Sequence, residues 1–437
     1  MSTAAYSRVA SWLDSISWRG IKPGLDRTRA LLHQVGDPDA GLHGVLVAGT
    51  NGKGSVCAIV DSVIRAAGLR SVLLTKPHLW SYTERFVVDG TPLTDDGFAQ
   101  LFDEVSDAAH ALPEELTPTA FEMLTVAGIL LAARAEPDVL VCEVGVGGRL
   151  DSTNVLDLGV AVVTNVDLDH RDLLGDTIPA IAREKAAIIK RANAAITGAT
   201  QPALGEIAAR AIEEQASLTV VGHRLPPGFA GSGREVPAAG ESLGWAGVRV
   251  RTEFAGAALD VRAPLLGAHQ VGNVAIAVAV CDELRRRGRA IDRTAVAAGC
   301  ARARWPGRLH WVDGRPGWLV DGAHNPAAMD ALVAAAADLL RDRRVVVLFG
   351  VMRDKERGPM VASLRRLNPA AVVLSAPPVD RAASPEELAA DFTGATVTHD
   401  VDAAMEAAAA LAGQDGAVVA CGSLYLAGEV LSRLGAL

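Results

Sequence analysis

The first half of the chain alternates short apolar runs with longer segments of helical periodicity, and this alternation restricts the fold more than any other feature. Four apolar runs are predicted to be buried strands: 45–48, 71–75, 139–143 and 160–166. Helical spacing fills the intervals at 56–67, 95–108 and 121–135. Strands that alternate with helices in this way predict a mostly parallel sheet with helices on both faces.

The pattern changes after residue 217. Gly and Pro are frequent at 222–240, and two stretches that alternate with period two follow, so residues of about 218–263 are predicted to form a small antiparallel unit. A helix is expected at 271–287, and "ARARWPGRLHWV" (301–312) is interpreted as an interdomain linker. Further strands are predicted at 345–350, 371–374 and 417–420. We therefore expect an α/β fold with a P-loop-containing, mostly parallel sheet domain at 1–303 and a smaller, Rossmann-like C-terminal α/β domain at 304–437.

Composition excludes several classes of protein. A formal net charge of -9 argues against general nucleic-acid binding, which needs a basic surface. The five cysteines are scattered, odd in number and mostly in apolar runs, which is typical of reduced thiols. The N-terminus lacks the pattern of a signal peptide, and no apolar stretch is long enough to span a membrane. We expect a cytoplasmic protein without nucleic-acid or membrane partners.

The stretch "VLVAGTNGKGSVCAIV" (45–60) reads as strand, Gly-rich turn and helix. A usual P-loop has Gly, four residues, then Gly-Lys-Ser/Thr. Here Val47 occupies the first glycine position, and Gly54 separates Lys53 from Ser55. Backbone N–H groups and the start of the helix suit a phosphate, Lys53 can neutralise it, and Ser55 can bind magnesium. The alternative is a Gly-rich turn without a ligand.

Two further clusters follow predicted strands of the same sheet. Glu143 ends the strand in "VCEVGVGGRLDSTN" (141–154), at the sheet edge where active sites of open α/β sheets lie; otherwise it caps the strand. His170 follows the next strand and is either a metal ligand or structural. Lys185 lies on a helix face that should be buried, so it needs a partner or a lowered pKa. A low-pKa lysine can react with carbon dioxide to give a metal-binding carbamate.

A fourth cluster, "LVDGAHNPAAM" (319–329), lies in the predicted C-terminal domain. Asp321 and His324 occupy a loop between a strand and a helix. Asn325 is predicted to be the N-cap of that helix, with Pro326 at its first position. Taken alone, the cluster is either a well-capped loop or part of a site.

In combination, these stretches resemble the folylpolyglutamate synthase/dihydrofolate synthase family of the Mur ligase superfamily. The resemblance covers nearly the whole chain, from "SWRGIKPGLDRTRALL" (17–32) to "GSLYLAGEV", through "AGTNGKGS", "KPHLWSYTERF", "TAFEMLT", "EVGVGGRLDSTN", "LGAHQVGN", "RWPGRL", "DGAHNP" and "FGVMRDK". In that superfamily the shifted Ser of the phosphate loop is normal. The resemblance implies an ATP- and Mg²⁺-dependent ligase that activates a carboxylate as an acyl phosphate and joins it to L-glutamate.

The resemblance also implies roles for individual residues. The phosphate loop that would hold ATP comprises Thr50, Asn51, Gly52, Lys53, Gly54 and Ser55. Ser55 and Glu143 would bind one Mg²⁺, and Glu143, His170 and Lys185 (as the carbamate) a second. Asn273, Arg308 and Asp321 would contact the nucleotide, and His324 would lie near it and the incoming amino acid. Closure of the second domain on the first would complete the site and exclude water.

The residues implied on the folate side are Lys76, His78, Trp80, Arg85, Phe121, Glu122, Asp151 and Ser152. Phe121 and Trp80 could stack on a pterin or aminobenzoate ring, or could belong to the core. Lys76 departs from the family, which usually has Ser there. Lys76 is either a solvated cation or a group that meets an anionic substrate such as a glutamyl tail.

Several functions remain open on the sequence alone. The favoured one is a monomeric folate ligase that acts on dihydropteroate, on reduced folates, or on both. A second is a family member redirected to a non-folate carboxylate, with Lys76 as its only support. A nucleotide-binding switch without turnover is disfavoured because Lys53, Glu143, His170, Lys185 and His324 are all present. A cell-wall Mur ligase is a weaker alternative, because "ERF", "GGRLD" and "EKA" fit the folate branch better.

Overall fold

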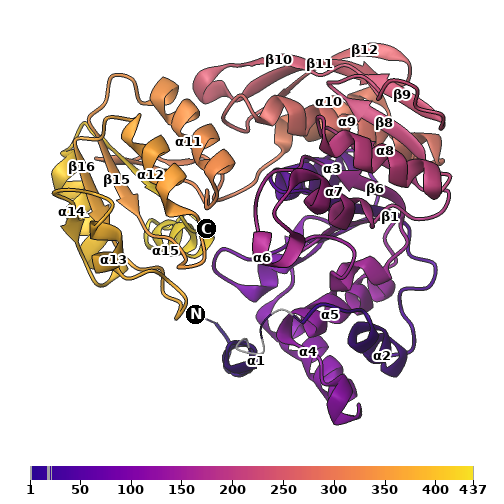
Figure 1. Cartoon of the computed structure of the whole chain (residues 1–437). Coiled ribbons are helices and arrows are strands. Elements are labelled where there is room, and N and C mark those ends of the chain that lie inside the picture. Colours follow the sequence, from indigo (N-terminus) through magenta and orange to yellow (C-terminus); the bar gives the residue numbers. More distant parts are fainter. Residues whose placement is uncertain (1, 17–19, 21, 437) are drawn as a thin grey trace. The chain divides into compact units, whose positions relative to one another are not determined.

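The computed structural model describes residues 2–16, 20 and 22–436; Ser17–Arg19 and Ile21, in the first motif of the resemblance, lie outside the described residues. The chain divides into two compact units, which Figure 1 shows in sequence colours. The first comprises residues up to 239, 250–261 and 272–303, and the second comprises 240–249, 262–271 and the chain from 304. Each unit contains its own large sheet and is described by itself.

The sheet of the first unit has nine strands in the order β4-β3-β2-β5-β1-β6-β7-β8-β9. Neighbouring strands from β2 to β9 pair in parallel, whereas β3 and β4 are antiparallel additions at one edge. The strands are β1 Gly44–Ala48, β2 Ser71–Leu74, β3 Phe86–Val88, β4 Thr91–Pro92, β5 Val139–Glu143, β6 Gly159–Val163, β7 Ala194–Thr197, β8 Ser217–Val221 and β9 Gly233–Val236. The mostly parallel sheet confirms the predicted fold class.

Helices cover both faces of this sheet, because its strands carry apolar residues on both faces. Leu46, Leu74 and Cys142 belong to one core cluster with residues of α4 and α5, and the intervening Val45 and Val141 are also fully buried, on the opposite face. The helices of this unit are α1 Ala4–Ile16, α2 Asp26–Gln34, α3 Lys53–Ala66, α4 Asp95–His110, α5 Ala120–Ala135, α6 Arg171–Leu174, α7 Ile178–Ala186, α8 Ala203–Glu213, α9 Gln270–Arg286 and α10 Arg293–Arg302.

The antiparallel part of the chain is shorter than the sequence predicts. β8 and β9 lie in the predicted antiparallel region but join the large sheet in parallel. Only β10 (Ala239–Ser242), β11 (Val248–Phe254) and β12 (Ala257–Ala263) form the separate three-stranded sheet. β11 and β12 are joined by Ala255-Gly256, both with positive φ, which is the geometry of a tight hairpin. The apolar strand at 218–221 is buried on both faces and therefore continues the parallel sheet.

The second unit has a six-stranded sheet in the order β13-β14-β18-β15-β16-β17. All neighbours pair in parallel except β13 with β14. The strands are β13 His310–Val312, β14 Gly317–Val320, β15 Val345–Phe349, β16 Ala371–Leu374, β17 Thr396–Val397 and β18 Ala417–Cys421, and the helices are α11 Pro326–Leu339, α12 Arg357–Arg365, α13 Pro385–Ala389, α14 Val401–Ala412 and α15 Leu424–Arg433. The second α/β sheet is thus confirmed, with β13 inside the stretch interpreted as a linker.

None of the helices in the described part of the chain combines the length and hydrophobicity needed to cross a membrane. All five cysteines are buried and free, as their apolar neighbours predict. In both large sheets the parallel strands end at one edge, and the polar motifs found in the sequence follow those ends. This edge is where ligands bind in open α/β sheets.

Candidate active site

The Gly-rich loop after β1 turns directly into α3. Gly49 and Gly52 have φ of +150° and +82°, and Cβ atoms there would lie 1.8 Å from Thr164 Oγ1 and 2.3 Å from Asn273 Oδ1. Gly52 is the N-cap of α3 and has no side chain to cap the helix. Lys53 Nζ donates to the carbonyls of Gly49 and Thr50, at 3.0 and 3.1 Å. A cation is therefore folded back over a helix start that lacks a side-chain cap, which is an arrangement suited to phosphate.

Residues after β6 hold this loop in shape. Asn165 Oδ1 accepts from the Asn51 amide at 2.8 Å, and the Asp167 amide donates to Thr50 Oγ1 at 3.0 Å. Sequence reasoning missed Asn165 and Asp167, although both lie in the stretch "TNVDLDH" that was singled out for His170. Their signal was polar residues directly after a buried strand that neighbours β1. Asn273, at the start of α9, lies against Gly52 of the phosphate loop; its contact with ATP stays a prediction.

Lys185 reaches the same loop from α7. Its Nζ donates to the Gly49 carbonyl at 3.0 Å, the same oxygen that accepts from Lys53. Burial, and then the nearby charge of Lys53, lowers the pKa of Lys185 to about 7, while Asp169 and Asp151 act in the opposite direction. The predicted burial of Lys185 is confirmed, and the amine has both a hydrogen-bond partner and a lowered pKa. A substantial fraction of its amines is neutral at physiological pH, which is the form that reacts with carbon dioxide.

Glu143 is buried at the end of β5, next to the phosphate loop. β5 pairs with β1 so that Glu143 lies opposite Val47, two residues before Gly49. Its Oε2 accepts from the backbone N–H of Lys76 at 3.0 Å. A carboxylate at this position can bind a cation that also contacts a phosphate.

His170 begins the short helix α6 with a left-handed backbone (φ +50°) and is partly exposed. Its Nε2 lies 4.0 Å from Asp169 Oδ1, and Asp169 is one of the charges that act on Lys185. Within the described ranges, no three His, Cys, Asp or Glu side chains gather closely enough to hold a metal ion. The predicted Mg²⁺ set depends on Ser55 and Lys185 as well as Glu143 and His170, so its ligation stays a prediction.

The glycine-rich loop after β5 packs against α7. A Cβ at Gly148 would lie 2.5 Å from the Glu184 carbonyl, and the Arg149 amide donates to the same carbonyl. Asp151 accepts from the amides of Val146 and Thr153 and from Thr153 Oγ1. Ser152 shares a hydrogen bond with Thr28, and both hydroxyls are buried. These contacts assign Asp151 and Ser152 a part in shaping the loop; their contact with substrate stays a prediction.

Lys76 follows β2 and turns toward the same sheet edge. Its Nζ lies 5.0 Å from the centroid of the Phe121 ring and 3.4 Å from the Glu143 carbonyl oxygen. The side chain is partly buried, and both interpretations of Lys76, as a solvated cation or as a group that meets an anionic substrate, stay predictions. Phe121 is likewise half-buried, and a Cβ on Gly145 would fall 2.5 Å from its ring. The Phe121 ring therefore borders the site and is not part of the core.

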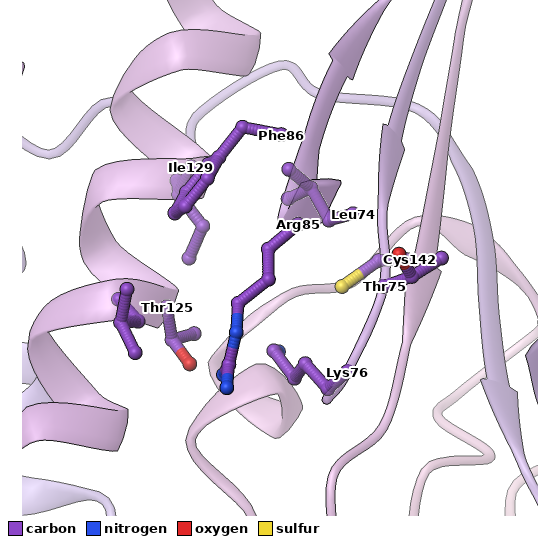
Figure 2. A pocket seen from close by; sticks show the side chains of 10 residues that line it. Leu74, Thr75, Lys76, Arg85, Phe86, Thr125, Ile129 and Cys142 are labelled. Atoms are coloured by element: carbon purple, nitrogen blue, oxygen red, sulfur yellow. The ribbon is translucent and has the colours of Figure 1, made fainter. Parts of the chain in front are cut away.

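A pocket opens beside Lys76, and its walls come from β2, β3, β5 and α5. Its lining residues are Leu74, Thr75, Lys76, Arg85, Phe86, Leu124, Thr125, Gly128, Ile129 and Cys142. Figure 2 shows Arg85 extending along the pocket, with Thr125 on one side and Lys76 on the other. The lining is apolar apart from two hydroxyls, a thiol and the two cations.

The other residues predicted on the folate side have structural partners. Arg85 Nε donates to His78 Nδ1 at 2.8 Å, and burial followed by the charge of Arg85 lowers the pKa of His78 well below its usual value. Glu122 is buried, accepts from Thr119 in a capping box and pairs with Arg27 at 2.8 Å. Trp80 is 52% exposed and therefore is not a core residue. The Arg27 partner of Glu122 was not anticipated from the sequence.

The remaining predicted residues lie in the second unit and meet around the loop after β14. Asp321 is buried and accepts from the amides of Leu309 and Ala323, both at 2.7 Å. Arg308 lies against Gly322, where a Cβ would fall 2.3 Å from the guanidinium, and His324 Nδ1 donates to the Gly322 carbonyl at 2.8 Å. Burial raises the pKa of Asp321, while nearby Arg308 and His269 lower it. The structure thus brings Arg308, Asp321 and His324 together; their contact with a nucleotide stays a prediction.

Comparison with known proteins follows the same division of the chain. The model of the Mur ligase middle domain matches residues 47–281, and that of the Mur ligase glutamate ligase domain matches residues 307–424. A dihydrofolate synthase/folylpolyglutamate synthase of Bacillus subtilis is 31% identical over 98% of this chain and 99% of its own length.

A probable bifunctional folylpolyglutamate synthase/dihydropteroate synthase of Halobacterium salinarum is 35% identical over 98% of this chain. The chain spans about half the length of that relative, 51%. The crystal structure of Mycobacterium tuberculosis folylpolyglutamate synthase complexed with ADP and AMPPCP superposes with a TM-score of 0.89 at 29% identity, covering 99% of this chain and 98% of that one.

Proposed function

Because the chain belongs to the folylpolyglutamate synthase/dihydrofolate synthase family of Mur ligases, we propose that it is an ATP-dependent ligase that joins L-glutamate to a folate-type carboxylate. One observation carries the proposal: Lys53 and Lys185 converge on the Gly49 carbonyl, beside a helix start without a side-chain cap and the buried Glu143. Lys53 at an uncapped helix start, a buried lysine that can become an anionic carbamate, and a carboxylate at the carboxyl edge of a parallel sheet suit phosphoryl transfer with bound Mg²⁺.

The reaction proceeds in two steps. An oxygen of the acceptor carboxylate attacks the γ-phosphorus of ATP, the bond to the bridging oxygen breaks, and an acyl phosphate and ADP form. The amine of glutamate then attacks the acyl carbon, the C–O bond to phosphate breaks, and the amide, inorganic phosphate and a proton are released. Lys53 and the first amides of α3 hold the phosphates during the first step, because both offer donors to anionic oxygens.

The donor set also fits Mg²⁺. Ser55 and Glu143 are buried oxygen donors close to the phosphate loop, and Lys185 is a buried amine that carbon dioxide can convert to an anionic carbamate. We assign Ser55 and Glu143 to one Mg²⁺, and Glu143, His170 and carbamylated Lys185 to a second. When bound, Mg²⁺ supplies the charge that screens the repulsion between phosphate and carboxylate. Until it is carbamylated, Lys185 contributes a proton donor to Gly49.

Dihydropteroate and reduced folates are the acceptors that we propose, since the relatives carry both dihydrofolate synthase and folylpolyglutamate synthase in their names. We further propose that the enzyme acts as a cytoplasmic monomer. A second candidate is a ligase redirected to a non-folate carboxylate. It is favoured only by Lys76, which replaces the Ser expected from the family resemblance.

Phosphate release tests the proposal directly. The intact chain is incubated with ATP, Mg²⁺ and L-glutamate, and dihydropteroate or a reduced folate is offered as acceptor. Turnover with both identifies a bifunctional enzyme, and turnover with one assigns the step. No release with either, while ATP still binds, would overturn the folate assignment in favour of the redirected ligase.

A further inference from the structure

The Lys76 ammonium forms no ion pair with the described part of the chain, although the Glu143 carboxylate accepts from its backbone N–H. Its Nζ contacts a backbone carbonyl and an aromatic ring, and among the described residues no Asp or Glu lies within ion-pair distance of that amine. The pocket that it borders contains a second cation, Arg85, and no acid. An ammonium held at a partly buried site without an ion-pair partner favours an anionic ligand there.

The position of Lys76 determines which anion it would meet. Its backbone N–H holds Glu143 Oε2, and Glu143 lies beside the phosphate loop through the pairing of β5 with β1. The pocket itself is mainly apolar, and Lys76, one of its lining residues, places its ammonium over the Phe121 ring. An acceptor whose ring lies on the Phe121 side of this edge would carry its terminal carboxylate past Lys76 toward the phosphates.

The choice of lysine is also informative. The chain has only six lysines among its 42 basic residues. Three of those six, Lys53, Lys76 and Lys185, lie around Gly49 and Glu143. A compact ammonium fits beside a ring and a carbonyl where a planar guanidinium needs more room. A solvated cation in this chain would be expected to be arginine.

We propose that Lys76 is a specificity-determining residue whose ammonium binds the reacting carboxylate of the acceptor, between the Phe121 ring and Glu143. This inference rests on the proposed function. The recognised chemistry is a planar, largely apolar acceptor that ends in a carboxylate. In this position the lysine orients the carboxylate for attack on the γ-phosphate and lowers its repulsion from ATP.

The test measures whether the affinity gained from the ligand's charge depends on the charge of the Lys76 side chain. Dihydropteroate and its neutral carboxamide are titrated by calorimetry into the intact enzyme and into the variants Lys76→Met, Lys76→Arg and Arg134→Met. Met keeps most of the length of Lys without its charge, and Arg keeps the charge. Arg134 is an exposed residue at the far end of α5, paired with Glu104, so its loss changes the net charge equally.

We expect the native enzyme and Arg134→Met to prefer the carboxylate by about 10- to 100-fold, the range for a charge-assisted hydrogen bond. Lys76→Met should bind both ligands alike, and Lys76→Arg should still prefer the carboxylate but bind both ligands more weakly, because the guanidinium needs more room. In turnover, Lys76→Met should raise KM for the acceptor and leave KM for ATP within about twofold.

Two results would overturn the inference alone: an undiminished carboxylate preference in Lys76→Met, or an equal loss of affinity for both ligands, which indicates a steric role. In both, the native enzyme would still convert dihydropteroate, so the proposed function would stand. If the native enzyme neither binds nor converts either acceptor while ATP binds, the folate assignment and the inference fail together.

Discussion

Two helices, α3 in the first unit and α11 in the second, begin at the same place in their sheets but in opposite ways. Each follows a buried parallel strand and a short polar loop at the carboxyl edge. α11 is closed by its own side chains, because Asn325 accepts from the Ala328 amide and Pro326 occupies the first turn. α3 starts at Gly52, which has no side chain to cap it.

The charges around these two helix starts also differ in sign. Lys53 and Lys185 gather at the loop before α3, whereas a buried carboxylate, Asp321, organises the loop before α11. The α3 loop therefore offers two lysines at an uncapped helix start, whereas the α11 loop is organised by its own carboxylate. In both units the fold places a loop and a helix start at the carboxyl edge of the sheet. The residues of the loop determine whether it suits a phosphate or is closed by its own side chains.

The largest expected effect is on turnover at the α3 loop. Lys185→Met should lower phosphate release by about 100-fold or more, the scale for removing one group that stabilises developing charge. The measurement is kcat with saturating ATP, Mg²⁺, glutamate and acceptor. Far-UV circular dichroism on the same sample verifies the fold. Near-native turnover would contradict the role of Lys185 in metal binding.

At the α11 loop, loss of charge should reduce stability. Asp321→Asn leaves one carbonyl oxygen where two backbone amides now find carboxylate oxygens, so an N–H of the new amide faces an N–H donor. We expect the free energy of unfolding to fall by about 1–3 kcal/mol in urea titrations. Asp338→Asn, an exposed residue on α11, is the control and should change it little. Equal stability of both variants would show that Asp321 does not organise the loop.

At the α3 loop, loss of a charge should increase the free energy of unfolding instead of lowering it. A lysine with a folded-state pKa of about 7 binds fewer protons folded than unfolded between about pH 7 and its ordinary pKa of 10.5. The native stability therefore includes a full penalty below pH 7, which is relieved as the pH rises. Lys185→Met removes this penalty, so without bicarbonate it should be more stable than the native chain at pH 7, by at most about 5 kcal/mol at about 1.4 kcal/mol per pKa unit.

The comparison between the two chains is repeated at pH 9, where the advantage of Lys185→Met should be smaller. Because both proteins contain the same buried thiols, their titration cancels in the difference. An advantage that is constant with pH would mean that Lys185 is not protonated on unfolding in this range. A variant that is more stable and yet inactive would separate the catalytic role of Lys185 from any role in folding.

The sequence predicts the motifs at the ends of the strands better than it predicts contacts between residues far apart in the chain. Glu143 and the phosphate loop follow apolar runs whose parallel pairing follows from strand–helix alternation, so their proximity could be anticipated. The capping of α11 by Asn325 is confirmed, because capping depends on neighbours in the sequence. Local patterns of this kind need no knowledge of distant contacts.

The failures involve contacts between residues far apart in the chain. β9 was assigned to the antiparallel unit because its Gly and Pro neighbours suggest a hairpin, but its pairing with β8 depends on the edge of a sheet formed elsewhere. The position of Lys76 over Phe121 depends on β2 lying beside β5 and α5, and the partner of Glu122 comes from α2. Sequence spacing contains no signal for any of these three.

The smallest expected effect tests whether the caps themselves distinguish the two helix starts. Asn325→Ala removes the acceptor of the Ala328 amide, at 2.9 Å, and should lower the free energy of unfolding by about 1 kcal/mol. Thr94→Ala on α4, whose side chain accepts from Gly97, is the matched cap in the first unit and should lower the free energy of unfolding by a similar amount.

Gly52→Ser tests the reverse change, because it adds a side-chain hydroxyl at the start of α3, where the native chain has no side-chain cap. The positive φ and the close Asn273 side chain oppose any side chain there, so Gly52→Ser should gain no stability and should weaken ATP binding in calorimetric titrations. If Gly52→Ser instead stabilised the chain and bound ATP normally, the missing cap would not be what makes this helix start a phosphate site.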